Sequence, residues 1–255
     1  MVTSQGASGV SKGVNSVHLA FAVLNEVARV GDIGVTELAR NLEMPKSSAQ
    51  RYVSTLHDAG WLIPVAASSS APTRWRIGPE PIGLGLRAVD RLSVQEILRP
   101  ALGELSRSTA ETVLLSLPED RGVLVVERIE GAHALRIVPP LGEYMPYTGS
   151  AAGLALALHL KPARWRVIQE VEAEAGFPPV RAEDLTLAQQ QGYAINNERW
   201  TEGVSAVGAA VLDKYGTPRG AISVASPTSR MSVRRAHEIG AQIVSKIESV
   251  GLLLR

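Results

Sequence analysis

The chain of 255 residues contains no cysteine. Disulfides, thiolate nucleophiles, cysteine-ligated zinc and iron–sulfur clusters are therefore excluded, and the absence suits a reducing compartment. The N-terminal residues hold no apolar segment of the kind found in secretory signals. The longest apolar run, residues 151–160, is about half of the ~20 residues that a membrane-spanning helix needs. We therefore expect a cytoplasmic protein with no membrane contact.

The chain also lacks a strong charge imbalance. Its formal net charge is +1, so the molecule as a whole is not a general polyanion binder. Contact with nucleic acid would have to come from a local basic patch or from a specific structural element. The composition, with 45% hydrophobic and 20% charged residues, is that of an ordinary globular protein, and the length allows two modest domains.

The motifs of common catalytic and cofactor sites are missing as well. The five histidines show no metal-ligand spacing. There is no P-loop, G-x-S-x-G, H-E-x-x-H or complete G-x-G-x-x-G motif. The sequence therefore predicts no metal ion, no cofactor and no catalytic residue.

The first third of the chain combines helical patterns with a hairpin pattern. Residues 1–13 are rich in Gly, Ser and Thr and predict a flexible N-terminal segment. Apolar residues then recur at helical spacing until Gly60, after which two short strands surround a polar tip at 66–72. Three helices followed by a hairpin predict a winged helix-turn-helix over 14–78. The predicted helices are 14–31, 35–42 and one within 43–60, and the strands are 61–65 and 73–78. The apolar stripe of the first helix is Val17, Ala20, Phe21, Leu24, Val27 and Ala28.

The rest of the chain reads as a linker helix over 79–92 and a second domain over 93–255, so the expected fold class is α+β. Pro100 lies in a helical pattern over 94–109 and marks a kink or a boundary between two helices. Strand and helix patterns follow in alternation. The predicted strands are 112–118, 122–131, 134–140 and two within 203–227, and the predicted helices are 150–160, 161–175, 182–191 and 232–251.

One helix in the first domain has a polar face that suits a DNA major groove. At 100° per residue its apolar positions fall on one side, and Ser, Gln, Arg and Lys fall on the other. Gln and Arg can bond base edges, while Ser and Lys can contact bases or phosphates. The predicted contacts are Lys46, Ser47, Ser48, Gln50 and Arg51.

Two alternatives compete for these residues. The face could simply be the solvated side of an amphipathic helix. The segment 47–50 also fits an S-x-x-Q capping box, in which Ser47 and Gln50 would bond backbone N–H groups instead of bases.

The second strand of the hairpin adds two further candidate DNA contacts. Arg74 and Arg76 alternate with Trp75, so both arginines share one face while Trp75 packs inward. Between residues 40 and 76 five basic residues stand against two acidic ones. Because this excess of three is modest, useful DNA affinity requires a homodimer on two half-sites of a palindromic operator.

Several segments together resemble the IclR family of bacterial transcriptional regulators. They are VTELARNLEMPKSSAQRYVSTLHDAGWL (35–62), LRPALGELSRSTAETVLLSL (98–117), PLGEYMPYTGSAAGLALAL (140–158), the segment 191–230 and the C-terminal helix. The resemblance runs from about Val14 to Gly251. It implies a winged helix-turn-helix and a GAF-like effector-binding domain, which is a curved antiparallel sheet with helices and a small-molecule cavity, joined by a linker helix.

Two segments are candidate walls of that cavity. Small residues at 149–153 precede an apolar helix, where a ligand could approach unpaired N–H groups; alternatively, they permit close helix–sheet packing. The second segment is 194–200 together with 204–206. Here the resemblance implies an aspartate and a cysteine where this chain has Asn196 and Ala206. In the helix after the small residues, many members of the family have a lysine where this chain has Leu154. We therefore expect a larger and less charged pocket. The predicted effector contacts are Leu135, Ile137, Met145, Gly149, Ser150, Ala151, Ala152, Asn196, Glu198 and Ala206.

The sequence thus predicts a ligand-responsive DNA-binding regulator of a catabolic operon, a repressor in preference to an activator. Its effector would be a small organic acid or amide, with an aromatic body as one option, and its assembly a homodimer or a dimer of dimers. An alternative is an enzyme acting on a small acid or amide through Ser150, Glu198 and Arg199, with the N-terminal domain as an oligomerisation module. A third possibility is a protein-binding winged-helix adaptor.

Overall fold

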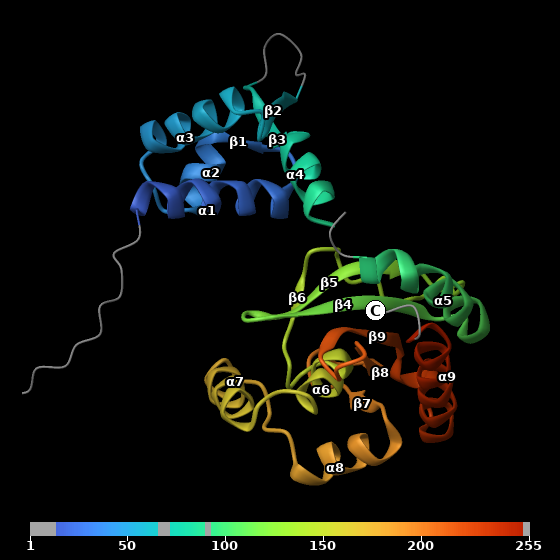
Figure 1. Ribbon diagram of the computed structural model, residues 1–255. Coiled ribbons are helices and arrows are strands. Elements are labelled where there is room, and N and C mark those ends of the chain that lie inside the picture. Colours follow the sequence, from blue (N-terminus) through green and yellow to red (C-terminus); the bar gives the residue numbers. More distant parts are fainter. Residues whose placement is uncertain (1–13, 66–71, 90–92, 252–255) are drawn as a thin grey trace, which may run out of the picture. The chain divides into compact units, whose positions relative to one another are not determined.

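The computed structural model describes residues 14–65, 72–89 and 93–251 (Figure 1). The chain divides into two compact units, Met1–Arg91 and Leu92–Arg255. The predicted flexible segment 1–13, most of the predicted hairpin tip, the end of the predicted linker and the last four residues lie outside the described residues. Each unit is described by itself.

The N-terminal unit contains a helix-turn-helix and a small antiparallel sheet (Figure 1). The strand order is β1-β3-β2, and the two-residue strand β1 is an addition that the sequence did not predict. A further helix, α4, follows the sheet. The elements are α1 (Asn15–Val30), β1 (Ile33–Gly34), α2 (Val35–Asn41), α3 (Lys46–Asp58), β2 (Leu62–Val65), β3 (Arg74–Ile77) and α4 (Glu80–Val89).

The core of this unit forms where α1 and α3 meet the sheet. Val23 and Val27 of α1 and Val53 of α3 are fully buried, and Trp75 packs against the same cluster, as predicted. The predicted stripe on α1 is only half correct. Val17 and Phe21 are 51% and 55% exposed, because the core covers only the C-terminal part of the helix.

The C-terminal unit is built on a six-stranded, curved antiparallel sheet with the order β6-β5-β4-β9-β8-β7 (Figure 1). Strands distant in sequence become neighbours, since β4 pairs with both β5 and β9. The strands are β4 (Thr112–Glu119), β5 (Gly122–Ile129), β6 (Tyr144–Met145), β7 (Ala194–Asn197), β8 (Val204–Leu212) and β9 (Pro218–Pro227).

Helices cover both faces of this sheet. One face packs against α5 (Ser93–Thr109) and α9 (Val233–Gly251) through a large apolar cluster. On the other face lies α6 (Ala151–Ala157), all of whose residues are buried. Two more helices, α7 (Pro162–Glu174) and α8 (Ala182–Gln191), flank α6, and a short 3-10 turn, η1 (Thr228–Arg230), precedes α9 (Figure 1). The α+β architecture expected from the sequence is confirmed.

Three details differ from the sequence prediction. Residues 134–140 form no strand; the short β6 pairs with β5 instead. The segment contains Pro139 and Pro140, which have no N–H to donate to a strand ladder. In addition, α5 continues through Pro100 as one helix, and β7 is a strand that the sequence reading treated only as a pocket wall.

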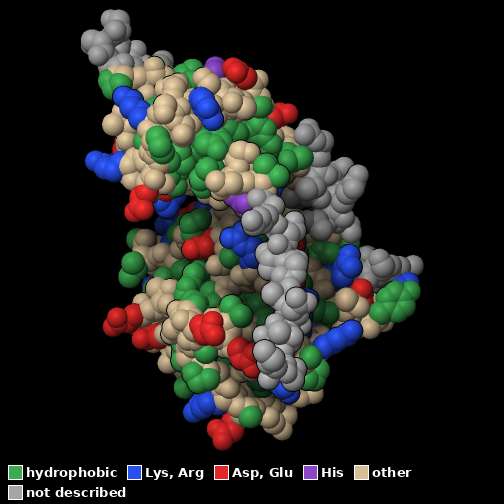
Figure 2. All heavy atoms as spheres, turned by 90° about the vertical axis from the view of Figure 1, so that its left-hand side faces the viewer, with side chains coloured by type: hydrophobic (Ala, Val, Ile, Leu, Met, Phe, Trp, Pro, Cys, Tyr) green, Lys and Arg blue, Asp and Glu red, His purple; other side chains and the backbone are tan. Residues whose placement is uncertain are grey.

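No single charge dominates the face of the molecule that Figure 2 shows. On the face seen in Figure 2, Lys and Arg are interspersed with Asp and Glu, and hydrophobic side chains are visible on the N-terminal unit. None of the helices within the described residues is both long enough and apolar enough to cross a membrane.

Candidate functional site

The first candidate surface is the polar side of α3. Ala49 and Val53 are fully buried, whereas Lys46, Gln50 and Arg51 are exposed. Ser47 is also exposed and Ser48 is half-buried. Within the described residues, the side chains of Lys46, Ser47, Gln50 and Arg51 form no hydrogen bond or ion pair with the protein. This face therefore keeps its bonding capacity for a partner.

The predicted capping box at the start of α3 does not form. The helix begins at Lys46 with Pro45 in the N-cap position (φ −57°, ψ 137°), and no side chain caps it. The extra helical residue places Ser47 inside the first turn, so Ser47 cannot act as the cap. The capping alternative is wrong, and Gln50 is not engaged by the backbone.

The connection before α3 has helix-turn-helix geometry. Four residues, Leu42–Pro45, join α2 to α3, and Glu43 adopts a positive φ of 49° within this turn. Arg51 borders a groove between α3 and α1, lined by Val17, Ala20 and Tyr52 among others. Arg51 is therefore on the part of the polar face that adjoins α1.

The two hairpin arginines have protein partners, unlike the residues of α3. Arg76 forms a bidentate contact with Asp32 at 2.9 and 2.8 Å, which lowers the pKa of the Asp32 carboxyl. Arg74 donates to the Asp32 carbonyl and lies 3.4 Å from the Glu37 carboxylate. These two acids precede the segment in which the charge was counted, and including them reduces the local basic excess from three to one. A DNA contact by either arginine would compete with an existing ion pair.

The second candidate site is a cavity of about 380 Å³ in the C-terminal unit. This volume lies within the range of roughly 300–1,000 Å³ that is typical of small-molecule sites. Its walls come from β4, β8 and β9, the start of α6, the loop 136–143 and the segment after β7. The apolar lining residues are Leu114, Ile137, Val138, Pro139, Met145, Ala151, Ala152, Trp200, Val204, Ala206 and Ala225.

The structure brings most of the predicted effector contacts to this cavity. The lining includes Ile137, Met145, Ser150, Ala151, Ala152, Asn196 and Ala206.

Three predicted contacts do not line it. Leu135 is 70% exposed, and Glu198 is exposed with a positive φ of 56°. Gly149 is buried behind Trp200, whose Cβ would lie 3.3 Å from an added Cβ.

The small residues at the start of α6 serve close packing. A Cβ added at Gly208 of β8 would lie 2.9 Å from the Ala151 carbonyl carbon, so the helix rests directly on the strand. Ser150 caps the helix by accepting from Gly153 N at 3.0 Å, and its hydroxyl donates to Pro146 O at 2.6 Å. The packing alternative is confirmed for this segment, while ligand contact by Ala151 and Ala152 stays a prediction.

Asn196 is held by the protein on both sides of its amide. Its Nδ2 donates to Gly149 O at 2.5 Å, and its Oδ1 accepts from Arg199 N at 3.2 Å. A carboxylate could not donate to the Gly149 carbonyl, which gives the amide at this position a structural role. Asn196 therefore shapes the cavity wall.

Two further charged residues hold the chain just before α6. Arg199 donates to Thr148 O at 2.9 Å and to the carbonyls of residues 178 and 179. From the other side, the Glu172 carboxylate accepts from the backbone N–H groups of Tyr147 and Thr148, both at 2.7 Å. From the sequence, Arg199 was named only in the enzyme alternative, and Glu172 was not singled out, because helical periodicity gives no sign of a loop partner.

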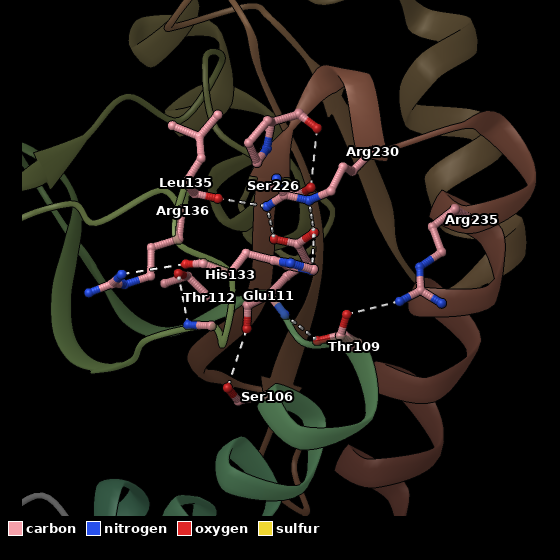
Figure 3. A network of polar contacts seen from close by, with 12 residues as sticks. Ser106, Thr109, Glu111, Thr112, His133, Leu135, Arg136, Ser226, Arg230 and Arg235 are labelled. Atoms are coloured by element: carbon pink, nitrogen blue, oxygen red, sulfur yellow. Dashed lines mark hydrogen bonds and ion pairs between the residues drawn. The ribbon is translucent and has the colours of Figure 1, made fainter.

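The loop that replaces the predicted strand is held by side chains (Figure 3). Glu111, only 4% exposed, accepts two bonds from Arg230 at 2.7 Å, and Arg230 also donates to Leu135 O at 3.0 Å. Further along, Arg128 donates to Pro139 O at 2.5 Å. Two backbone carbonyls of this segment, those of Leu135 and Pro139, are thus bonded to arginines.

Comparison with known proteins shows to which protein family the chain with these two sites belongs. The model of the bacterial transcriptional regulator IclR C-terminal domain matches residues 86–250, and the IclR helix-turn-helix domain matches residues 16–63. The chain belongs to the IclR family. As an IclR-family protein it is a DNA-binding transcriptional regulator with an effector-binding domain, and not an enzyme.

Individual IclR-family relatives agree over most of the chain. The HTH-type transcriptional regulator BhcR of Paracoccus denitrificans is 30% identical over 92% of this chain and 85% of its own length. The transcriptional repressor IclR of Escherichia coli is 25% identical over 94% of this chain and 89% of its own. The crystal structure of Thermotoga maritima IclR has a TM-score of 0.75 at 21% identity, covering 94% of this chain and 98% of that one, and supports the fold.

Proposed function

We propose that this IclR-family regulator is a repressor that binds a palindromic operator as a homodimer or a dimer of dimers. It would control a catabolic operon and respond to a small organic acid or amide with a largely apolar, for example aromatic, body. The observation that carries the proposal is the cavity of about 380 Å³, mainly apolar, in the unit that matches the family's C-terminal model.

The DNA part of the proposal rests on α3. Its exposed residues Lys46, Ser47, Gln50 and Arg51 have no protein partner in the described part of the chain. The N-terminal part of a recognition helix is the part that reaches base edges in helix-turn-helix proteins. We assign Gln50 and Arg51 to base contacts, Lys46 to a phosphate, and Ser47 and Ser48 to either.

We infer a dimer because a single N-terminal unit would bind DNA weakly. The local basic excess is small, and Arg74 and Arg76 already have acidic partners. One copy would gain little from phosphate contacts, whereas two copies on two half-sites add their contacts. Repression is favoured over activation because a relative such as the Escherichia coli protein is itself a repressor.

The effector part of the proposal rests on size and lining. The cavity can hold a small molecule with an apolar body, and Trp200 offers it an aromatic surface. Ligand and DNA binding would be coupled, and the coupling must be reciprocal: an effector that weakens operator binding is itself bound more weakly when operator is present.

A selection of bound duplexes from a random pool, followed by gel shifts at three salt concentrations, tests the DNA part. We expect one enriched palindromic sequence, and an affinity loss of about tenfold or more in a Gln50→Ala/Arg51→Ala variant, because each base contact contributes roughly 1–3 kcal/mol. Arg29→Ala is the matched control, since it removes one exposed basic side chain from α1 in the same unit.

Equal thermal stability of the double variant and wild type would show that a loss of binding does not come from unfolding; Arg29→Ala loses its ion pair with Glu26 and is therefore assayed well below its own melting temperature. Wild-type protein that enriches no sequence would contradict the proposal. So would a double variant that binds the enriched operator as tightly as wild type.

A further inference from the structure

Half of the polar side chains that line the cavity, those of Arg136, Ser150 and Asn196, are bonded to the protein. The Ser150 hydroxyl both donates and accepts, and both ends of the Asn196 amide are engaged. Arg136 gives its Nε and Nη2 to the Glu130 carboxylate, each at 2.8 Å, and its Nη1 faces the His133 carbonyl. The lining therefore offers no unpaired cation among the described residues.

One buried lining residue, Ser223, has a hydroxyl that forms no hydrogen bond with the described part of the protein. Ser223 lies on β9 and is only 3% exposed. Its neighbours across the sheet are Leu114 on β4 and Gly208 on β8, and neither has a side chain that could bond it. Its oxygen is not among the fully enclosed unpaired atoms of the described residues, so it opens into the cavity and is accessible to a bond from there. A ligand in the cavity can supply the missing bond.

One lining carboxylate is also left without a partner. Glu143 is half-buried beside β6, and its side chain forms no ion pair or hydrogen bond in the part of the chain that the structure describes. Burial alone raises the pKa of its carboxyl group, with no neighbouring cation to oppose the shift. Its backbone is fixed, because Val125 N donates to Glu143 O at 2.9 Å and Glu143 N donates to Pro140 O. The main chain of Glu143 is thus fixed at the cavity wall, and its side chain is among those that line the cavity.

We propose that Glu143 and Ser223 determine specificity in this cavity, so that the effector carries a hydrogen-bond donor head, a primary amide or an amine, and no free carboxylate. The inference rests on the proposed function of the cavity and narrows its ligand class. A donor head can satisfy the Glu143 carboxylate through a charge-assisted bond. A carboxylate head would face a like charge with no free cation to offset it.

The test is isothermal titration calorimetry on the full chain with matched probes. Three apolar bodies (phenylacetyl, cyclohexanecarbonyl and isovaleryl) are each presented as a primary amide and as a carboxylate, together with the amine of the same carbon skeleton. We expect at least one amide or amine to bind about tenfold or more tightly than its carboxylate, because hydrogen bonds to charged groups contribute roughly 1.5–3 kcal/mol. No carboxylate should bind more tightly than its amide.

Three variants assign the preference to residues. Glu143→Gln should abolish most of the tenfold discrimination, and Ser223→Ala should weaken the preferred probe several-fold. Glu174→Gln, at an exposed position on α7 of the same unit, is the matched control and should bind as wild type does. Without ligand, Glu143→Gln should melt at or above the wild-type temperature, because it removes an uncompensated half-buried charge. A lower melting temperature would overturn the inference, since it would show that the fold itself uses the carboxylate.

The failures can be told apart. If the carboxylates bind more tightly to wild type, the donor-head inference is wrong and the effector role of the cavity stands. If Glu143→Gln retains full discrimination, Glu143 is not the determinant. If no probe with any head group binds, the cavity does not take ligands of this size, and both the inference and the effector part of the proposed function fail.

Discussion

On α3, four polar side chains extend from the surface without a partner in the described residues, whereas the polar residues that hold the cavity walls in place, such as Asn196 and Arg199, are bonded to the protein. The difference reflects what each region must do. A DNA-reading face needs only exposure and spacing, which a single helix provides. A cavity must keep its shape while empty, and Asn196, Arg199, Glu172 and Arg230 do this by bonding backbone carbonyls and N–H groups.

The largest effect should come from breaking the loop anchor of the cavity. Arg230→Met leaves Glu111 as a buried carboxylate without its main partner. Removing one member of a buried ion pair costs about 3–5 kcal/mol, and the partial exposure of Arg230 places the expected loss near the lower end. Urea unfolding measures it. Arg234→Met, which breaks an exposed pair with Glu238, should cost less than about 1 kcal/mol; equal losses would contradict the anchor role.

A smaller effect should separate the two kinds of arginine in the N-terminal unit. Arg51→Ala should lower operator affinity by roughly ten- to a hundredfold, in line with about 1–3 kcal/mol for a base contact. Arg76→Ala should lower it by less than Arg51→Ala, because Arg76 must give up Asp32 to contact DNA. Competition gel shifts on the selected operator measure both. A larger loss for Arg76→Ala would reverse the assignment of reading residues.

The structural role of the Asn196 amide can be tested with one substitution. Asn196→Asp removes the donor to Gly149 O and should cost about 1–3 kcal/mol at neutral pH. A protonated aspartic acid can donate this bond again, so the gap to wild type should narrow as the pH falls and widen as it rises. Urea titrations at several pH values provide the measurement. A variant as stable as wild type at pH 7 would show that the amide is not needed for the wall.

The smallest effect concerns acid stability in the N-terminal unit. Hydrogen bonds from Arg29 and then Asn41 lower the pKa of Glu26 from 4.5 to about 2. A lowered folded-state pKa gives stability that is present above pH 4.5 and is lost as the pH falls toward 2. In the Glu26→Gln variant the free energy of unfolding should therefore fall less between pH 6 and pH 2 than it does in wild type. Fluorescence-detected unfolding at several pH values in this range measures it. The same pH dependence in the variant and in wild type would count against a contribution from Glu26.

Local patterns in the sequence were enough to predict helix α3 and most of the other helices and strands. Buried Ala49 and Val53 alternate with exposed Gln50 and Arg51 at helical spacing, and this signal depends on neighbouring residues alone. The family resemblance supplied the curved sheet and the position of the cavity, including Met145 and Ala206.

What could not be predicted depends on contacts between distant segments. Residues 134–140 have strand composition, but Arg230, nearly a hundred positions away, donates a hydrogen bond to the Leu135 carbonyl. The acidic partner of Arg76, Asp32, precedes the helix-turn-helix, and that of Arg74, Glu37, lies in its first helix. Ser223 was missed because β9 is buried on both faces, so no alternation marks the side that lines the cavity.

The attachment of the loop 135–139 through its backbone carbonyls has a consequence for divergence within such regulators. The anchoring bonds from Arg230 and Arg128 do not depend on which side chains the loop carries. Ile137 and Val138, which face the cavity, can therefore be exchanged by mutation without losing the attachment. A change of effector specificity can then evolve through single substitutions in one wall while the sheet beneath it stays the same.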